Sequence, residues 1–532
     1  MRQRARGFLT VGTTTTVAAT VAVVVTLAVL ALRAQTPPLE IGIVNARLIT
    51  GSGVIAGATN VGVRAGRIEM VDESLARRAT LVIDARGQVV APGFIDVHSH
   101  GLETLTRPEI RGAVSELAQG VTTIVGNPDG GGPVDLAKQA ADLEANGGIG
   151  INVALLIGHG SVRSAVMGGA NRAPTGVELD KMRALVRQAV ADGAFGMSSG
   201  LFYTPGRYAT TEEVIALAKV AGGVYTSHIR DEGNYAEGVV ASVDEVIRIA
   251  DEAKVAGIVS HMKALGPDSW GKSAELIAHI EAARRRGVNV WADQYPYEAS
   301  STSLGAAVLP DAGNVAAMRA QLADPVQKAK LLAVAKENIR RRGGPHSIQI
   351  ASARDASLNG NGKRLDEIAA AHSRTPEEMA VDIVLSGGAS IVSFNMSEDD
   401  IRAIMRQPWT MTSSDGALSV RGPSVPHPRN NGAFARKLGV YVRERHVVSL
   451  EAAVRSMTSL PAEVFGFKDR GVLRTGAVAD VVIFDPAAIV DHATYEHPHE
   501  LSTGVSWVIV NGVVEWRDGT PTGARAGRVL RR

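Results

Sequence analysis

Histidines and aspartates follow short apolar runs at several points in this chain. His98 and His100 end the run GFIDVHSH, while His228 and His261 each follow a serine at the end of a later run. Asp415 ends the run TMTSSD. Imidazole nitrogens and carboxylate oxygens are ligands that proteins offer to zinc and related divalent ions. These residue types therefore indicate a metal site, provided that the fold brings them together.

The spacing of the first pair fits a shared cation. Residues two apart on an extended segment point to the same side, so His98 and His100 can both face one ion. The HxH pattern alone is not specific, and a single histidine such as His228 or His261 is more often a satisfied or solvated residue. Their common placement at strand ends, together with Asp415, favours a metal site.

The glycine-rich stretch IVGNPDGGGP, residues 124–133, adds a carboxylate, Asp129. A phosphate-binding P-loop is excluded because no Gly-Lys-Ser/Thr follows the glycines. The Asn-Pro-Asp-Gly residues suit a turn. An aspartate oxygen also binds zinc, at about 2.0–2.2 Å. Asp129 is therefore a candidate metal ligand, with a purely turn-forming role as the alternative.

A serine nucleophile is a competing interpretation. Residues 196–200, GMSSG, fit the G-x-S-x-G pattern with Ser198 in the centre. That pattern needs a strand, a sharp turn and a helix. Here the loop GLFYTPGRY follows, with Pro205 and Gly206, so the context disfavours a serine hydrolase.

Eight apolar segments alternate with helical periodicity and would position these groups. The expected strands are GFIDVH, VTTIVG, INVALLIG, AFGMSS, GVYTSH, GIVSH, NVWAD and TMTSSD. This alternation predicts an α/β fold, a (β/α)₈ TIM-type barrel, with a doubly wound open sheet as the alternative. The carboxyl ends of barrel strands open on one face, where residues distant in sequence meet.

Both chain ends read as short β segments. Residues 41–90 and 465–532 are therefore expected to form one small β-sandwich domain, in which Asn511-Gly512 makes a hairpin turn. Residues 91–464 would form the barrel, with an insertion at about 303–395.

The N-terminus and the composition indicate where the protein is located and what kind of partner it binds. Arginines at positions 2, 4 and 6 precede a nearly continuous apolar run over residues 17–32, which predicts a signal peptide or an uncleaved membrane anchor within residues 1–36. The expected location is periplasmic or extracellular. The formal net charge of +2 gives no reason to expect a nucleic-acid partner, so a small-molecule substrate is expected. The chain has no cysteine, hence no thiolate ligand.

Ten motifs in order resemble the N-acyl-D-amino-acid deacylases (D-aminoacylases) of the amidohydrolase superfamily. They are APGFIDVHSH, LIGHGSVR, GAFGMSSGLFYTPG, SHIRDEG, SHMKALG, DQYPYEASST, MTSSDG, HPRNNGAFARKLGVYVRE, SLPAEVFGFKDRG and GARAGRVLR. The resemblance covers about residue 41 to the C-terminus. It implies a barrel that binds one or two divalent ions, most typically zinc, with a β-domain built from both ends and an insertion near the seventh strand.

Residue by residue, the resemblance assigns ligand roles to the four histidines and to Asp415, which follows the eighth strand. One position departs from the family pattern. Where the family reads GNCG and uses a cysteine, this chain reads GNPDG, and the fourth strand offers Met197, Ser198 and Ser199 instead of a carboxylated lysine. Asp129 is the nearest anionic substitute.

The implied activity is metal-dependent hydrolysis of N-acyl amino acids, mainly D-configured, with Asp415 as general base and acid. Hydrolysis of a cyclic amide or a dipeptide, and a non-catalytic binding protein on the same fold, are the alternatives. Four residues after strand ends are expected to bind substrate: Tyr203, Arg230, Lys263 and Tyr295. Lys263 and the tyrosines follow from the resemblance, and Arg230 from the ability of arginine to bind a carboxylate in a bidentate manner.

Overall fold

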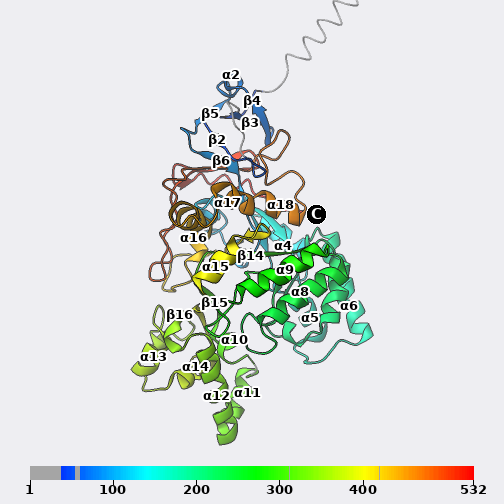
Figure 1. Cartoon of the computed structure of the whole chain (residues 1–532), viewed down its shortest axis with the longest axis vertical. Helices are drawn as coiled ribbons and strands as arrows, with labels where there is room; N and C mark the ends of the chain where they lie inside the picture. The colour runs from blue at the N-terminus through cyan, green and yellow to red at the C-terminus, as the bar shows by residue number, and fades with distance from the viewer. Residues whose placement is uncertain (1–37, 54–59, 311, 419) are drawn as a thin grey trace, which may run out of the picture.

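The computed structural model describes residues 38–53, 60–310, 312–418 and 420–532 (Figure 1). The predicted signal peptide or anchor lies outside these residues. Across the described part of the chain, no helix is both long and apolar enough to traverse a bilayer.

Parallel strands separated by helices form the central barrel. Their bounds are β7 (Phe94–Asp96), β8 (Val121–Gly126), β9 (Asn152–Leu155) with its continuation β10 (Ile157–Gly158), β11 (Gly196–Gly200), β12 (Val224–His228), β13 (Ala256–Val259), β14 (Val290–Gln294) and β18 (Thr410–Thr412). One sheet holds β7, β8 and β9, and the other runs from β10 to β18. Only Leu156 separates β9 from β10, and a parallel bridge between Ser99 and Gly416 joins the first strand to the last. These links join the strands of the two sheets in a ring, which is consistent with the predicted barrel and disfavours an open sheet.

The strands and helices of the barrel follow from their sequence patterns. Every residue of β8 is buried, as expected for a strand covered by helices on one face and by the barrel interior on the other. Helices cover the outside: α3 (Val114–Leu117), α4 (Leu136–Glu144), α5 (His159–Met167), α6 (Gly176–Ala191), α7 (Thr211–Ala221), α8 (Val239–Ala253) and α9 (Ser273–Arg285). Helix α6 begins at a capping box between Thr175 and Glu178, and α8 buries Val243, Val246 and Ala250 on one face.

An insertion between β14 and β18 forms the lower lobe in Figure 1. It contains β15 (Ala299–Ser303), α10 (Leu304–Val308), α11 (Val315–Ala323), α12 (Pro325–Arg341), β16 (Ile348–Ala353), α13 (Leu365–Ala371), α14 (Pro376–Leu385) and β17 (Ala389–Phe394). Its three strands form an antiparallel sheet in the order β15-β17-β16. Leu304, Ile350 and Ile391 belong to a hydrophobic cluster of the insertion's own. The observed segment starts slightly before the predicted residue 303, because β15 pairs with β17 along its whole length.

Two sheets at the opposite end of the molecule pack into the small β-domain (Figure 1). One contains β1 (Ile41–Val44), β3 (Asn60–Arg64), β4 (Arg67–Val71) and β5 (Leu81–Asp84). The other contains β2 (Arg47–Leu48), β6 (Val89–Pro92), β19 (Val481–Phe484), β20 (Val505–Val510), β21 (Val513–Arg517) and β22 (Thr520–Pro521). Ile43, Val63 and Ile483 share one core. Asn511 and Gly512 both have positive φ, 51° and 85°, as a tight hairpin turn between β20 and β21 requires.

The C-terminal strand departs from the predicted domain boundary of 465–532. β23 (Val529–Leu530) pairs in parallel with β9 of the barrel, and the amide of Val153 donates to the carbonyl of Arg528 at 2.9 Å. The physical reason is that β11 pairs with β10 and not with β9, which leaves one edge of β9 to be paired by the tail. The end of the chain therefore belongs to the barrel.

The helices that close the chain around the barrel complete the architecture. They are α15 (Glu398–Met405), α16 (Arg429–Arg436), α17 (Leu450–Met457) and α18 (Ser459–Phe465). Helix α16 begins within the HPRNNG stretch, residues 427–432.

Candidate metal centre

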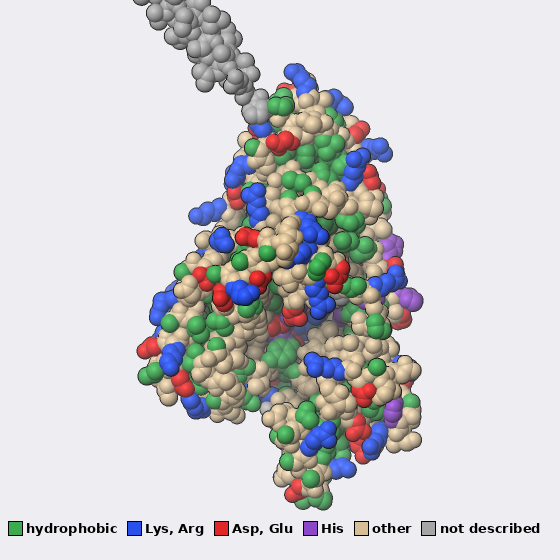
Figure 2. Space-filling view, turned by 180° about the vertical axis from the view of Figure 1, so that it is seen from behind, with side chains coloured by type: hydrophobic (Ala, Val, Ile, Leu, Met, Phe, Trp, Pro, Cys, Tyr) green, Lys and Arg blue, Asp and Glu red, His purple; other side chains and the backbone are tan. Residues whose placement is uncertain are grey.

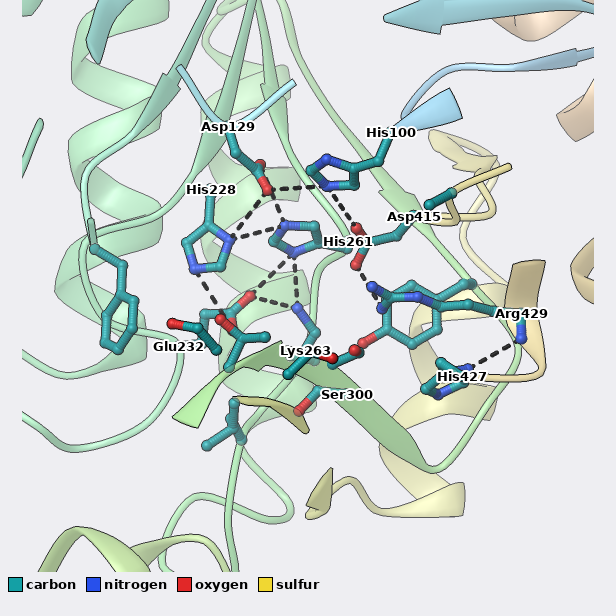
Figure 3. Close-up of a pocket in the computed structure, with 18 of the residues that line it drawn as sticks. His100, Asp129, His228, Glu232, His261, Lys263, Ser300, Asp415, His427 and Arg429 are labelled. Carbon is teal, nitrogen blue, oxygen red and sulfur yellow. Dashed lines mark hydrogen bonds and ion pairs between the residues drawn. The ribbon is translucent and has the colours of Figure 1, made fainter. Parts of the chain in front are cut away.

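The predicted ligands meet at the carboxyl ends of the barrel strands (Figure 3). His98 and His100 follow β7, His228 ends β12, and His261 follows β13. Asp129 and Asp415 come from the loops after β8 and β18. The structure thus brings all six residues to one place.

Asp129 lies at the centre of the four imidazoles. Its Oδ1 is 3.4 Å from Nε2 of His98 and 3.6 Å from Nε2 of His261. Its Oδ2 is 3.5 Å from Nε2 of His100 and 3.8 Å from Nδ1 of His228. One carboxylate therefore faces every histidine of the set; Figure 3 shows it beside His100, His228 and His261.

The loop of Asp129 is held in a left-handed conformation, with φ of 54° at Asp129 itself. The hydroxyl of Ser198 donates to the carbonyl of Asn127 at 2.6 Å and accepts from the amide of Gly130 at 3.1 Å. A Cβ at Gly200 would lie 2.3 Å from the carbonyl oxygen of Asp129, so only glycine allows this approach. The turn and the inward carboxylate are two aspects of one loop.

These contacts also settle the role of Ser198. Its side chain is fully buried in β11 and its hydroxyl is used by the loop after β8. Among the described residues no imidazole bonds to it, so the G-x-S-x-G match does not form a nucleophile.

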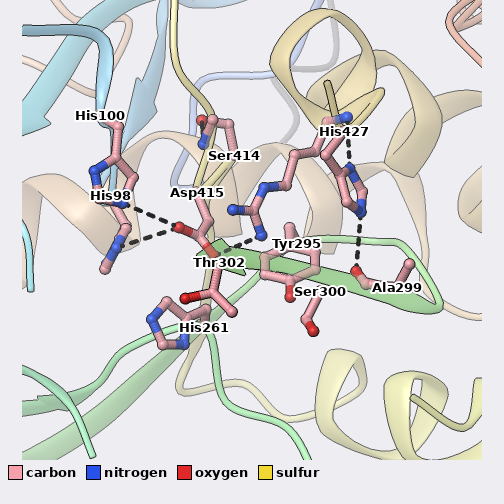
Figure 4. Close-up of polar contacts among 12 residues, drawn as sticks. His98, His100, His261, Tyr295, Ala299, Ser300, Thr302, Ser414, Asp415 and His427 are labelled. Carbon is pink, nitrogen blue, oxygen red and sulfur yellow. Dashed lines mark hydrogen bonds and ion pairs between the residues drawn. The ribbon is translucent and has the colours of Figure 1, made fainter. Parts of the chain in front are cut away.

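Asp415 lies at the edge of the histidine cluster and has two different oxygens. Oδ1 is 3.6 Å from Nε2 of His98 and 3.4 Å from Nε2 of His100. Oδ2 forms an ion pair with Nη1 of Arg429 at 2.7 Å (Figure 3), and the carboxylate, which Figure 4 shows beside His98 and His100, is almost fully buried. One oxygen faces the centre while the other is held by a cation.

The donor set fits a divalent cation. Nitrogen and oxygen ligand atoms of His98, Asp129, His261 and Asp415 all lie within 4.8 Å of one another. Nε2 of His98 and Oδ1 of Asp129 are buried without a hydrogen-bond partner. Because unpartnered buried polar atoms are costly, an ion between them would satisfy both. Mixed imidazole and carboxylate ligation suits zinc and similar ions.

The electrostatics of the cluster keep the carboxylates ionised. Burial raises the pKa of Asp129, but His98, His100 and His261 outweigh it and hold the pKa well below its usual range. Burial also raises the pKa of Asp415, but the positive charges of Arg429 and His261 outweigh this effect, and the pKa is lowered. Both groups are therefore available as anionic ligands.

The histidines divide into two kinds. Burial lowers the pKa of His228 to about 4. Burial and Lys263 lower that of His261, but Asp415, Glu232 and Asp129 outweigh them and raise the pKa to about 10. For His100, burial is outweighed by Asp129 and Asp415, and the pKa is raised well above its usual value. Metal binding needs neutral imidazoles, so it would displace protons from His100 and His261.

Glu232, which the sequence analysis did not single out, supports this centre. It pairs with Nζ of Lys263, and its Oε1 lies 3.0 Å from Nδ1 of His261. Nζ of Lys263 also lies 2.7 Å from Nδ1 of His261, so the Glu232–Lys263 pair holds the second ring nitrogen of this candidate ligand and orients the ring. The available signal was an acidic residue four positions after His228 in SHIRDEG, but such residues are usually solvated.

The centre opens into a cavity of about 570 Å³ between the barrel and the insertion. Figure 2 shows a hollow in the surface near the middle of the molecule, above the lower lobe, with acidic and basic side chains inside it. Three predicted substrate-binding residues, Tyr203, Lys263 and Tyr295, line it. His427 and Arg429 line it as well, and neither is among the substrate-binding residues predicted from the sequence.

The fourth predicted substrate-binding residue, Arg230, is a correction. Its guanidinium pairs with Glu245 on α8 at 2.8 Å and donates to the carbonyls of Arg207 and Ala209 at 3.1 Å. It does not line the metal-site cavity. The carboxylate of Glu245 draws the side chain toward the helix layer, which a pattern along one strand end does not reveal.

Comparison with known proteins agrees with this arrangement. The sequence model described as the amidohydrolase family matches residues 81–514. The chain belongs to the amidohydrolase family. Its match to this family confirms the resemblance inferred from the ten motifs.

Individual amidohydrolases match over nearly the whole chain. D-aminoacylase of Alcaligenes xylosoxydans xylosoxydans is 35% identical, covering 94% of this chain and 99% of that protein. N-acyl-D-glutamate deacylase of the same organism is 36% identical, covering 91% and 95%. The crystal structure of N-acyl-D-glutamate deacylase from Bordetella bronchiseptica, complexed with zinc and a phosphonate inhibitor, has a TM-score of 0.80 at 35% identity, covering 93% of this chain and 100% of that one.

Proposed function

We propose that this chain is a zinc-dependent hydrolase of N-acyl amino acids, with N-acyl-D-amino acids as its substrates. The products are a carboxylate and the free amino acid. The observation that carries the proposal is the cluster of four imidazoles around Asp129 with Asp415 at its edge. The similarity to a D-aminoacylase and to N-acyl-D-glutamate deacylases supports the configuration of the substrate.

The residues that would hold one or two zinc ions are His98, His100, Asp129, His228, His261 and Asp415. Zinc, which the Bordetella bronchiseptica relative contains, polarises an amide carbonyl and lowers the pKa of bound water from about 15.7 to about 7. Asp129 stands in for the cysteine that the family resemblance would place beside Pro128.

Asp415 is the group that moves protons. Its Oδ1 faces the centre, where an attacking water would lie, and its Oδ2 is fixed by Arg429. An ionised carboxylate in this position accepts the proton of the water and delivers it to the departing nitrogen. Arg429 keeps the carboxylate oriented through both steps.

Cationic and aromatic side chains next to Asp415 suit the carboxylate of the substrate amino acid. The guanidinium of Arg429 lies 4.7 Å from the centre of the Tyr295 ring, and Nζ of Lys263 lies 5.6 Å from it. Arginine binds carboxylates in a bidentate manner, while a lysine adds a point charge. Tyr203 donates or accepts a hydrogen bond with Thr302 at 3.1 Å and forms the adjoining wall.

A substrate panel tests the proposal. The metal content of the purified protein is measured, and the protein is assayed with N-acetyl derivatives of D- and L-amino acids. The assay is repeated after a chelator has removed the metal and again after zinc has been added back. We expect hydrolysis of D-configured substrates, loss with the chelator and recovery with zinc. A protein with full metal content that cleaves no N-acyl amino acid would contradict the assignment.

We also propose that the chain is exported, and the support is the sequence alone. The three arginines and the apolar run within residues 1–36 have the order of a signal peptide or an N-terminal anchor. Fractionation of producing cells, with N-terminal sequencing of the protein, tests this. A cytoplasmic protein with an intact N-terminus would contradict it.

A further inference from the structure

Arg342 is a buried cation in the wall that the insertion contributes to the metal-site cavity. It directly follows α12 and is 2% exposed. It lines the same cavity as His100 and Asp129, together with Ser300 of β15. In Figure 3 Ser300 lies on the far side of Lys263 from Asp129, which places this wall away from the reacting centre.

The hydrogen-bond partners of Arg342 are all neutral. Nε donates to Oγ of Ser393 at 3.0 Å, Nη1 to the hydroxyl of Tyr235 at 2.9 Å, and Nη2 to Oγ of Ser300 at 3.3 Å. Among the described residues no carboxylate forms an ion pair with it. Hydroxyls accept from three of its five N–H groups but do not neutralise its charge.

The other cationic side chains of the cavity differ from Arg342 in this respect. Lys263 pairs with Glu232, and Arg429 pairs with Asp415 at 2.7 Å. A buried charge without a counterion is costly, so proteins normally provide a partner. The guanidinium of Arg342 has no such partner among the described residues, and it lies in the wall of the cavity that a substrate would enter.

A structural role alone accounts for only part of this arrangement. Arg342 caps the carboxyl end of α12, where a positive charge is favourable, and it ties the helix to Ser393 and Ser300 of the sheet. The cavity wall around it is lined by further hydroxyls, those of residues 301–303 and of Ser390. Hydroxyl donors beside an unpaired guanidinium are the groups that bind a carboxylate.

We infer that Arg342, with Ser300 and Tyr235, binds a second carboxylate of the substrate, remote from the one at Arg429. The inference rests on the proposed function and names its substrate class: N-acyl amino acids with an additional acidic group. That group belongs either to the amino-acid side chain or to a dicarboxylic acyl chain. Both sources present the same chemistry to the guanidinium.

Matched substrate pairs test the inference and identify the source. N-acetyl-D-glutamate against N-acetyl-D-glutamine probes the side chain, and N-succinyl-D-alanine against N-butyryl-D-alanine probes the acyl chain. We expect the unaltered protein to favour the acidic member of one pair by about tenfold or more in kcat/KM, because the neutral member leaves the guanidinium unpaired.

Variants then assign the preference to Arg342. Arg342→Gln should remove the preference while the neutral substrate is cleaved at a similar rate, and Arg342→Lys should retain part of it. Arg340→Gln is the control: Arg340 lies on the same helix, is exposed and pairs with Glu337 and Asp268, so the preference should not change.

The outcomes are distinguishable. If Arg342→Gln folds and loses the preference for the acidic substrate, the inference is supported. If Arg342→Gln does not fold, a weakened preference for the acidic substrate in Arg342→Lys supports it. Equal losses on acidic and neutral substrates, or no acidic preference in the unaltered protein, overturn it while the proposed function stands. If the metal-bound protein cleaves other N-acyl amino acids of the panel but no member of either pair, the inference fails and the proposed function stands; failure on the whole panel overturns the proposed function itself.

Discussion

Two walls enclose the same cavity and are built on different principles. The barrel wall carries Asp129, Asp415 and Glu232, each facing imidazoles or a cation of the same wall. The insertion wall carries hydroxyls and Arg342, whose charge has no counterpart among the described residues. The difference indicates that the charges of the barrel wall are balanced within the protein, while the charge of Arg342 in the insertion wall is left to be balanced by a bound substrate.

The way in which each wall is supported agrees with this division. The strands that carry the metal ligands are buried on both faces, so the positions of the ligands are set by the main core. The insertion has a hydrophobic cluster of its own, which includes Leu304 and Ile350. Its side chains are therefore able to vary without disturbing the ligands of the barrel.

Removing the central carboxylate should have the largest effect on the barrel wall. Asp129→Ala leaves four imidazoles without the anion that faces them all, so we expect metal content well below one ion per chain and turnover at background. Asp129→Asn should also lose metal, although it keeps the turn. Metal analysis and steady-state assays measure both effects.

Asp142→Ala is the matched control, because Asp142 is exposed on α4, away from the histidines, and pairs with Lys138 on the same helix. Unchanged metal stoichiometry and activity in both Asp129 variants would show that the loop only makes a turn.

Asp415→Asn separates proton transfer from metal binding. The amide keeps the shape and most of the contacts but cannot accept the proton of water, so we expect kcat to fall by about 10²–10⁴-fold. Metal content should stay close to that of the unaltered protein, since the four histidines and Asp129 remain. A near-normal kcat would show that another group moves the proton.

Glu232→Gln tests whether the barrel wall depends on its supporting carboxylate. The change leaves Lys263 unpaired and weakens the contact to Nδ1 of His261. Loss of such support typically costs about 10–100-fold in metal affinity or activity. Competition with a zinc chelator measures the affinity, and zinc added in excess should restore part of the activity. Wild-type affinity and kcat together would show that Glu232 serves only to solvate Lys263.

The smallest effect on activity is expected from a substitution outside the cavity, at the buried base Lys437. Its Nζ donates to Thr412 at 2.8 Å and to Ser456 at 2.9 Å, and burial lowers its pKa to about 7. The unfolded chain binds the proton more tightly, so between about pH 7 and pH 10 the contribution of Lys437 to stability rises with pH. Below that window the folded protein buries a charge without a carboxylate partner.

Lys437→Met should therefore stabilise the protein near pH 6 by roughly a few kcal/mol, and by less near pH 9.5. Thermal unfolding of both proteins at the two pH values measures the difference. Equal changes in melting temperature at the two pH values would contradict the assigned charge effect. Lys437 would then behave like Lys263 and Arg429, whose charges are balanced by carboxylates.

The sequence predicted those parts of the molecule that are periodic or that end a strand. Apolar runs identified all eight barrel strands, and the polar residues at or just after their ends were the four histidines, Asp129 and Asp415, which the structure brings together. The two-residue strand β23 is too short to leave a pattern, so its pairing with β9 was missed.

Contacts between side chains of different elements were not accessible in the same way. Arg230 has the type and position of a substrate ligand, but Glu245 on α8 holds it elsewhere. Glu232 and Arg429 became recognisable only through their distances to His261 and Asp415. Both cases depend on which helix packs beside which strand end, and that is a property of the packed structure.

The carboxylate at position 129 also bears on the chemical durability of the centre. A thiolate ligand is oxidised by peroxide to sulfenic and higher acids and exchanges with disulfides. The candidate ligands here are imidazoles and carboxylates, and the chain contains no cysteine. Oxidants that inactivate thiolate-ligated metal sites therefore have no thiolate to attack at this one, and we expect its activity not to require a reducing environment.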